Sequence, residues 1–159
     1  MDREAFVQAV GPVFEHSPWV AEQTWPKRPF PDRAGLHQAL CQTVAASSQE
    51  NRLGLIRAHP DLVGKAAMAG TLTSASTQEQ ASAGLDQLSA DEVARFQRYN
   101  QQYREKFGFP FVICARLNKK AAILAGFEAR LKNSQEHEIQ AALAEVYKIA
   151  ELRLQALVT

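Results

Sequence analysis

The sequence has 159 residues, of which 46% are hydrophobic and 22% are charged, which fits one domain with a single hydrophobic core. The formal net charge is +1 and no run of five or six like charges occurs, so neither a nucleic-acid surface nor a membrane-binding basic segment is indicated. Because there is no signal peptide and no apolar run of the roughly 18 residues that span a bilayer, we expect one cytoplasmic domain over residues 1–159.

Helix signals dominate the N-terminal part of the chain. Asp2 is a candidate N-cap for a first short helix, and Ser17 with Pro18 pairs an N-cap with a proline at the first helical position. The second helix is expected to run through Trp25. The pattern then predicts an ordered loop with three prolines over 26–31, and helices over about 32–46 and 48–58.

Two S-x-x-E sequences mark helix starts in the middle of the chain. Ser76 with Glu79 fits a capping box that opens a helix through Leu85. Ser89 with Glu92 repeats the signature before a longer helix that ends at about Lys106, with Gly108 as the stop signal. Further helices are predicted from Asn118 to about Lys132 and from Ser134 to about Leu157.

The fold class predicted from these elements is all-α. The segment 109–117 is the one strand-like stretch, and since a single strand has nothing to pair with, we interpret it as an irregular buried segment or a helix start. The last helix is the most periodic, with apolar residues recurring at spacings of three, four and seven. We therefore predict a compact single-domain bundle of about seven to nine helices.

Arg153 lies at the flank of the apolar stripe of that last helix. A buried guanidinium must be paired, so an anionic group is expected to meet it. From the residues alone, a snorkelling side chain or a salt bridge inside the core is favoured over a role in binding an anionic or carbonyl-rich ligand.

Two further residues permit both a structural and a chemical interpretation. Glu79 is explained by the capping box alone. His59 precedes Pro60 and is therefore placed at or just beyond a helix end, where it can interact with the last carbonyl groups. Histidine is also the usual general acid or base near neutral pH, so a catalytic His59 stays open.

Several kinds of site have no signature in this chain. The four histidines show no HxxxH or HExxH spacing, so no metal site is expected, and neither a nucleotide-binding glycine loop nor a GxSxG elbow is present. Cys41 and Cys114 form no CxxC pair and are expected to be reduced, buried thiols. A nucleophilic Cys114 would need a basic neighbour that a sequence does not reveal.

The stretch from His59 to Gly84, HPDLVGKAAMAGTLTSASTQEQASAG, resembles the signature of the OHCU decarboxylases. OHCU is 2-oxo-4-hydroxy-4-carboxy-5-ureidoimidazoline, an intermediate of urate breakdown. Three more stretches agree with the family in order along the chain: EHSPWVAEQTW at 15–25, FGFPFVICAR at 107–116 and KIAELRL at 148–154. HPDL, STQEQ and FGFPF together make the resemblance specific, and it extends over nearly the whole chain.

The resemblance implies an all-α homodimer without a cofactor or metal, which decarboxylates its small ureidoimidazoline substrate to (S)-allantoin. It implies His59, Glu79 and Arg153 as catalytic residues. The substrate-binding residues that it implies are Pro60, Ser76, Thr77, Gln78, Glu79, Gln80, Phe111, Val112, Ile113, Cys114 and Ala115, the last five largely through backbone groups. Cys114 departs from the small apolar residue that the family pattern suggests there.

Two alternatives stay open from the sequence. One is a non-catalytic helical module that binds a partner protein or a ureide. The other is a related ureide lyase or hydrolase with a similar site and a different substrate.

Overall fold

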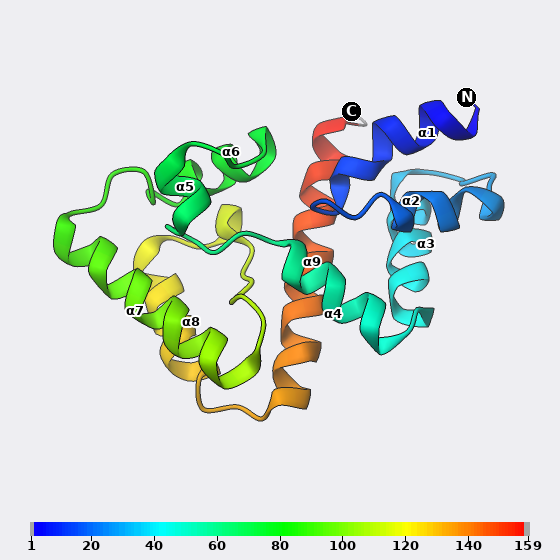
Figure 1. The fold of residues 1–159 in the computed structure, drawn as a ribbon. Coiled ribbons are helices and arrows are strands. Elements are labelled where there is room, and N and C mark those ends of the chain that lie inside the picture. The colour runs from blue at the N-terminus through cyan, green and yellow to red at the C-terminus, as the bar shows by residue number, and fades with distance from the viewer. Residues whose placement is uncertain (1, 158–159) are drawn as a thin grey trace. The chain divides into compact units, whose positions relative to one another are not determined.

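The structure is a computed structural model, and it describes residues 2–157. Within that range the chain forms nine α-helices and three short 3-10 helices, with no β-strand (Figure 1). The all-α prediction is therefore confirmed. By its internal contacts the chain divides into two compact units, one formed by residues up to 58 together with those from 146, the other by residues 59–145. A single domain over 1–159 stays a prediction.

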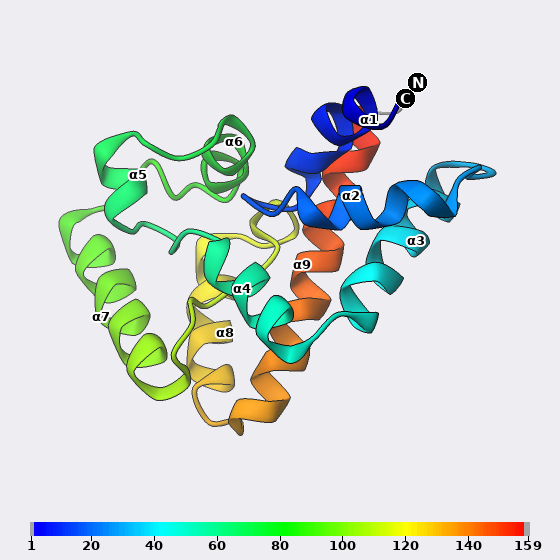
Figure 2. The same ribbon diagram turned by 45° about the vertical axis from the view of Figure 1, so that its right-hand side comes forward.

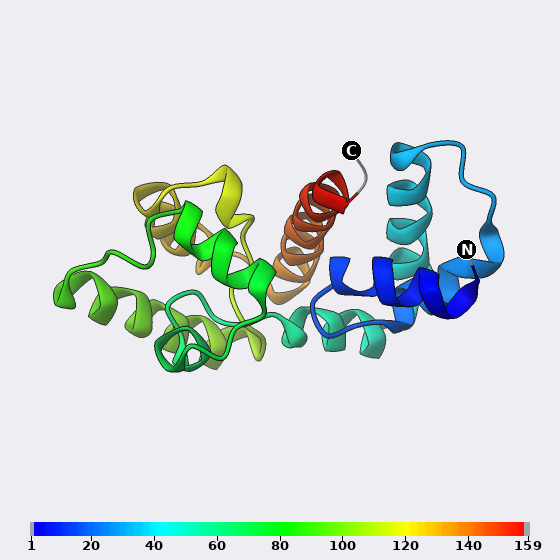
Figure 3. The ribbon, with the colours of Figure 1, turned by 90° about the horizontal axis from the view of Figure 1, so that it is seen from above.

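The first unit contains the N-terminal helices and the C-terminal half of the last one. Its elements are α1 (Arg3–Val10), η1 (Gly11–Val13), α2 (Trp19–Thr24), η2 (Trp25–Lys27), α3 (Arg33–Ala46), α4 (Gln49–Ala58) and the second half of α9 (Gln135–Leu157). Figures 2 and 3 show these helices in blue to cyan, and α2 packs against both α1 and α3. The helices α3, α4 and α9 end within two residues of the predicted positions.

Side-chain caps account for most of the starts in this unit. Asp2 accepts a hydrogen bond from the backbone N–H of Ala5 at 2.8 Å, and Asp32 caps α3 in the same way through Gly35 at 2.7 Å. The prediction that Ser17 caps α2 is wrong, because its hydroxyl donates to the backbone oxygen of Glu15 instead. Helical backbone geometry already begins at Pro18. The proline ring fixes φ near the helical value, and α2 starts without a side-chain cap.

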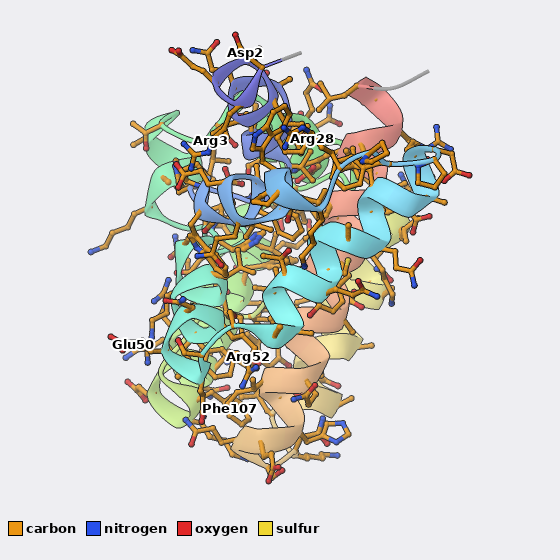
Figure 4. All side chains as sticks on the ribbon, turned by 90° about the vertical axis from the view of Figure 1, so that its right-hand side faces the viewer. Asp2, Arg3, Arg28, Glu50, Arg52 and Phe107 are labelled. Atoms are coloured by element: carbon orange, nitrogen blue, oxygen red, sulfur yellow. The ribbon has the colours of Figure 1, made fainter. Side chains whose placement is uncertain are left out.

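The turn between α3 and α4 is closed by a long basic side chain. Arg52 donates from Nη1 to the backbone oxygens of Ala45 and Ser47, each at 2.9 Å, and so satisfies carbonyl groups at the end of α3 (Figure 4). Ser48 accepts from Asn51 N–H and starts α4. These contacts join the first turn of α4 to the end of α3; α4 ends at Ala58, and His59 is the next residue.

The second unit carries the central helices. Its elements are α5 (Lys65–Ala69), α6 (Ser74–Ser82), α7 (Ala90–Phe107), η3 (Ala115–Leu117), α8 (Lys120–Arg130) and the first half of α9. Figures 1 and 2 show the short turn η3 directly below α6, and Lys119, just after η3, donates from Nζ to the backbone oxygen of Ser82 on α6 at 2.7 Å. The segments 76–80 and 111–117 are therefore neighbours in this unit.

The boundaries of α7 follow the predicted signals and those of α8 do not. Ser89 and Glu92 form a complete capping box, and Gly108 ends α7 with a φ of 78°, which a residue without a Cβ adopts at little cost. Asn118 was predicted to cap α8, and this is wrong: its Nδ2 donates back to the oxygen of Cys114 at 2.9 Å. The helix begins at Lys120 without a side-chain cap.

No helix in residues 2–157 is both long enough and apolar enough to cross a membrane.

Candidate active site

The loop that follows α4 presents His59 as a buried side chain. α4 ends at Ala58, as expected from the restriction that Pro60 imposes on the residue before it. His59 is 6% exposed, and Pro60 beside it is half-buried. The sequence-based position of His59, just beyond a helix end, is confirmed, whereas its catalytic role stays a prediction.

The helix α6 begins earlier than the capping-box signature predicts. Thr73 is the N-cap, and its Oγ1 accepts from the N–H of Ser76 at 3.2 Å. Ser76 is thus the third residue of the helix, and the predicted capping box of Ser76 and Glu79 is wrong. Since the helix begins at Ser74, Glu79 lies in the middle of α6. Capping of the helix start therefore does not explain its carboxylate.

The predicted substrate-binding stretch 76–80 presents several faces. Ser76 and Gln80, four residues apart, are buried; Glu79 is half-buried; Thr77 and Gln78 are exposed. The Thr77 hydroxyl donates to the backbone oxygen of Thr73 at 2.9 Å, so it serves the helix start. Only one side of this stretch is therefore enclosed by the unit.

The segment 111–115 is irregular and largely buried, as predicted. The ring of Phe111 stacks on that of Phe127 with centroids 3.9 Å apart, and it meets Tyr103 edge-on at 5.4 Å. The backbone N–H of Cys114 donates to Glu145 Oε1 at 3.1 Å. The ring of Phe111 thus anchors the segment in the core, and the role of the segment in substrate binding stays a prediction.

A buried ionic network of Glu138, Arg130 and Tyr103 contacts the segment 111–115. Glu138, with no exposed surface, accepts from Arg130 Nε at 2.7 Å and from the Tyr103 hydroxyl at 2.6 Å, and Asn133 donates to its second oxygen at 2.8 Å. Arg130 also donates to the backbone oxygen of Val112. Burial, followed by the hydrogen bond to Glu138, raises the pKa of Tyr103 far above its usual value, so its hydroxyl stays a donor.

Cys114 is a poor candidate for a nucleophile. It is 1% exposed and forms no disulfide. Burial is the largest cause that raises the pKa of its thiol, and the carboxylates of Glu145 and Glu79 add to the effect. Since the thiolate is the reactive form, the structure favours the interpretation of Cys114 as a buried thiol.

Arg153 lies in the other unit and is held by a buried carboxylate. Its Nη2 is 2.9 Å from Glu15 Oε2, and its Nη1 donates to the backbone oxygen of Pro12 at 3.1 Å. Arg153 is 7% exposed and Glu15 is 2% exposed. A buried guanidinium was expected to meet an anionic partner, and Glu15 is that partner.

The second unit also has a cavity of about 390 Å³ beside α6. Its wall includes Thr77 and Gln80 but neither His59, Glu79 nor the segment 111–115. The remaining lining residues are apolar apart from Asp86: Val63, Ala67, Met68, Leu72, Ala81, Leu85, Leu88 and Val93. The cavity therefore does not unite the predicted catalytic residues.

Among the predicted residues, His59, Glu79 and the segment 111–115 belong to one unit, and Arg153 belongs to the other. Local sequence patterns did not reveal Glu15, Glu138 and Glu145, because each of these carboxylates has partners far away along the chain. Glu15 was quoted in the motif at 15–25, yet nothing local distinguished its carboxylate. Among residues 2–157, no group of three or more His, Cys, Asp or Glu side chains is arranged to hold a metal ion.

Among known protein families, a family of decarboxylases matches this all-α chain. The family model described as OHCU decarboxylase matches residues 1–155. The chain belongs to the OHCU decarboxylase family.

Known relatives agree with this assignment. The 2-oxo-4-hydroxy-4-carboxy-5-ureidoimidazoline decarboxylase of Halalkalicoccus jeotgali is 47% identical over 98% of this chain and 86% of the relative. The uric acid degradation bifunctional protein of Bacillus subtilis is 37% identical over the whole chain, which matches 31% of that longer protein. The crystal structure of an (S)-allantoin synthase superposes with a TM-score of 0.79 at 28% identity, over 99% of this chain and 51% of that one.

Proposed function

We propose that this chain is a cofactor-independent carboxy-lyase that converts OHCU to (S)-allantoin in the breakdown of urate. The observation that carries the proposal is the match to the OHCU decarboxylase family over residues 1–155. The presence of a histidine and a glutamate at the family's positions, His59 and Glu79, supports it.

The substrate supplies much of the chemistry of this reaction. Breaking the bond to the carboxylate releases CO2 and leaves an electron pair on a ring carbon. The pair moves into the neighbouring ring C=N bond, so that a C=C bond forms between the two ring carbons and the ring nitrogen takes up a proton. The carbon that bears the ureido group is then protonated on one face, while the hydroxyl on the other carbon loses its proton and becomes the carbonyl group of allantoin. The protein has to orient the carboxylate, stabilise the developing charge and deliver the proton to one face of the ring.

We assign the proton transfer to His59, because histidine acts as acid or base near neutral pH. Glu79 orients His59 or binds the ureido N–H groups of the substrate. Backbone N–H groups of the segment 111–115 bind substrate oxygens. Since the Cys114 N–H already donates to Glu145, the neighbouring residues of the segment supply these donors.

Arg153 is proposed to bind a substrate oxygen. The planar guanidinium is suited to bidentate contacts, and its orientation is fixed by Glu15 and the backbone oxygen of Pro12. Arg153→Lys keeps the charge and loses the planar fork, so it is expected to raise KM. Kinetics equal to those of the wild type would leave Arg153 with its structural role alone.

The activity is tested by the rate of OHCU loss. OHCU is generated from urate with urate oxidase and hydroxyisourate hydrolase, and CO2 release is followed with and without this protein. We expect release in proportion to protein concentration, and a loss of ~10²–10⁴-fold in His59→Ala. A rate equal to spontaneous decay with folded protein would contradict the proposal and favour a binding module.

A homodimer and a cytoplasmic location are also proposed, and both rest on the resemblance to the family. Light scattering coupled to size-exclusion chromatography tests the first: a mass near 17.6 kDa, that of one chain, would contradict it. Fractionation of the producing cells tests the second.

A further inference from the structure

The turn that follows His59 is held by side chains from two helices. Asp61, Leu62 and Val63 come directly after His59 and Pro60. Each of these three consecutive residues makes a hydrogen bond or ion pair to a side chain of α6 or α7.

Gln80 on α6 binds both ends of this turn. Its Oε1 accepts from the N–H of Val63 at 3.1 Å, and its Nε2 donates to the backbone oxygen of Asp61 at 3.3 Å. Both polar atoms of this buried amide therefore serve the turn, although the resemblance places Gln80 among the substrate-binding residues.

Two residues of α7 complete the set. Asn100 Nδ2 donates to the backbone oxygen of Leu62 at 2.7 Å. Arg104 Nε lies 3.0 and 3.1 Å from the two carboxylate oxygens of Asp61. Asn100 is 6% exposed, whereas the Arg104 side chain is 46% exposed, so the buried amide is the stronger restraint.

The conformation of the turn requires such restraint. Val63 has a φ of 55°, in the left-handed region that a β-branched residue rarely adopts. A Cβ added to Gly64 would lie 2.7 Å from the Cβ of Asp61, so the chain closes tightly on itself here. Strained backbone of this kind persists only where the surroundings hold it.

Asn100 is costly to keep for stability alone. Its Oδ1 is buried and has no hydrogen-bond partner in the part of the chain that the structure describes. Asn100 thus donates one hydrogen bond to the turn while its own oxygen stays without a partner. The position of the turn beside His59 gives a reason for this arrangement that stability does not.

We propose that Gln80, Asn100 and Arg104 are positioning residues, which fix the orientation of His59 by holding the Asp61–Val63 turn. Pro60 transmits the restraint, because its ring fixes its own φ and restricts the backbone of His59. This inference rests on the proposed function of His59.

The test is Asn100→Leu, which keeps the number of side-chain heavy atoms and the branching at Cγ and removes the donor to Leu62. Gln101→Ala is the matched control, since Gln101 is the next residue on α7 and is exposed. We expect kcat to fall by about ten- to a hundredfold, because a catalytic group displaced by about 1 Å loses activity on this scale. KM is expected to change less than about threefold. The control is expected to match the wild type.

A second measurement does not depend on activity. The Val63 amide donates to Gln80, so its hydrogen exchange is expected to be slow in the wild type and at least tenfold faster in Asn100→Leu. The His59 ring resonances are expected to shift or broaden in the same variant. If the wild type has no decarboxylase activity, these two signals still decide whether the turn is held as proposed.

Arg104→Ala keeps the inference testable if Asn100→Leu does not fold, because it removes an exposed ion pair. We expect a smaller fall in kcat, of about two- to fivefold, and faster exchange at Val63. The inference is overturned if the folded variants exchange the Val63 amide at the wild-type rate, or if only their KM changes. It is also overturned if the wild type is active and a variant exchanges this amide faster but keeps the wild-type kcat.

Discussion

Two S-x-x-E sequences lie thirteen residues apart in this chain and have different structures. At Ser89, the hydroxyl accepts from Glu92 N–H at 3.2 Å, and the Glu92 carboxylate accepts from Ser89 N–H at 3.0 Å. At Ser76 the reciprocal pair does not form, because the N–H of Ser76 donates to Thr73. The same spacing gives a capping box in one helix and a mid-helix glutamate in the other.

The difference comes from what precedes each serine. Thr73 caps α6, so the helix already begins at Ser74 and Ser76 lies inside it. The residue three positions before Ser89 is Asp86, which lies in the turn after α6, closed by the hydrogen bond from Gln87 N–H to the oxygen of Gly84, and no helix begins there. A capping box therefore explains Glu92 completely and does not explain Glu79, which is the residue that the family resemblance assigns to catalysis.

Among the changes that test this comparison, Glu79→Gln is expected to have the largest effect. Neutralising a carboxylate that orients the acid–base group should lower kcat by about a hundredfold, with little change in thermal stability, since Glu79 caps no helix. Glu92→Gln is the matched control, with the same chemical change on α7 and no expected loss of activity. Steady-state OHCU decarboxylation by both variants checks this, and equal rates would remove the proposed distinction.

Removal of the caps sharpens the comparison in terms of stability. Thr73→Ala and Ser89→Ala should each reduce the free energy of unfolding by about 1 kcal/mol, the usual cost of losing a side-chain cap. Only Thr73→Ala is expected to lower kcat as well, because α6 carries Glu79. Denaturant titration with the activity assay measures both. A Ser76→Ala variant that loses more stability than Thr73→Ala would mean that the start of α6 is misassigned.

The smallest expected effect is on pH dependence. The hydrogen bond from Lys120, 2.7 Å from Glu92 Oε2, and then those from Ser89 lower the pKa of Glu92 from near 4.5 to about 2. A depressed pKa in the folded state means that the stabilisation is present above pH 4.5 and is lost as the pH falls towards 2. Carboxyl NMR titration should find Glu92 at the low value, and Lys120→Ala should raise it; a titration near 4.5 in the wild type would contradict the complete capping box.

Local signals in the sequence predicted much of the fold. Asp2, Asp32, Ser89 and Gly108 act on backbone groups within four residues, so the chain around them carries the whole signal. The predictions that Ser17 and Asn118 cap helices were wrong, because their side chains donate to other backbone oxygens nearby, those of Glu15 and Cys114. A pattern of residue types does not distinguish among such competing short-range partners.

The candidate site was predictable only in part. The position of His59 followed from Pro60, and the need of Arg153 for an anion followed from its burial. Its partner Glu15 lies 138 residues earlier, and Asn100 contacts a carbonyl 38 residues away. Contacts of this range depend on packing of the completed units, and the assignment of a reaction depended on the family motifs.

The handedness of the product tests the central claim most directly. In free solution a proton reaches both faces of the ring equally, so unaided decay of OHCU gives racemic allantoin, whereas a protein-bound donor reaches one face. Circular dichroism of OHCU formed in situ should develop a lasting (S)-allantoin signal at a rate proportional to this protein. A racemic product, with the folded protein present in excess, would contradict the account.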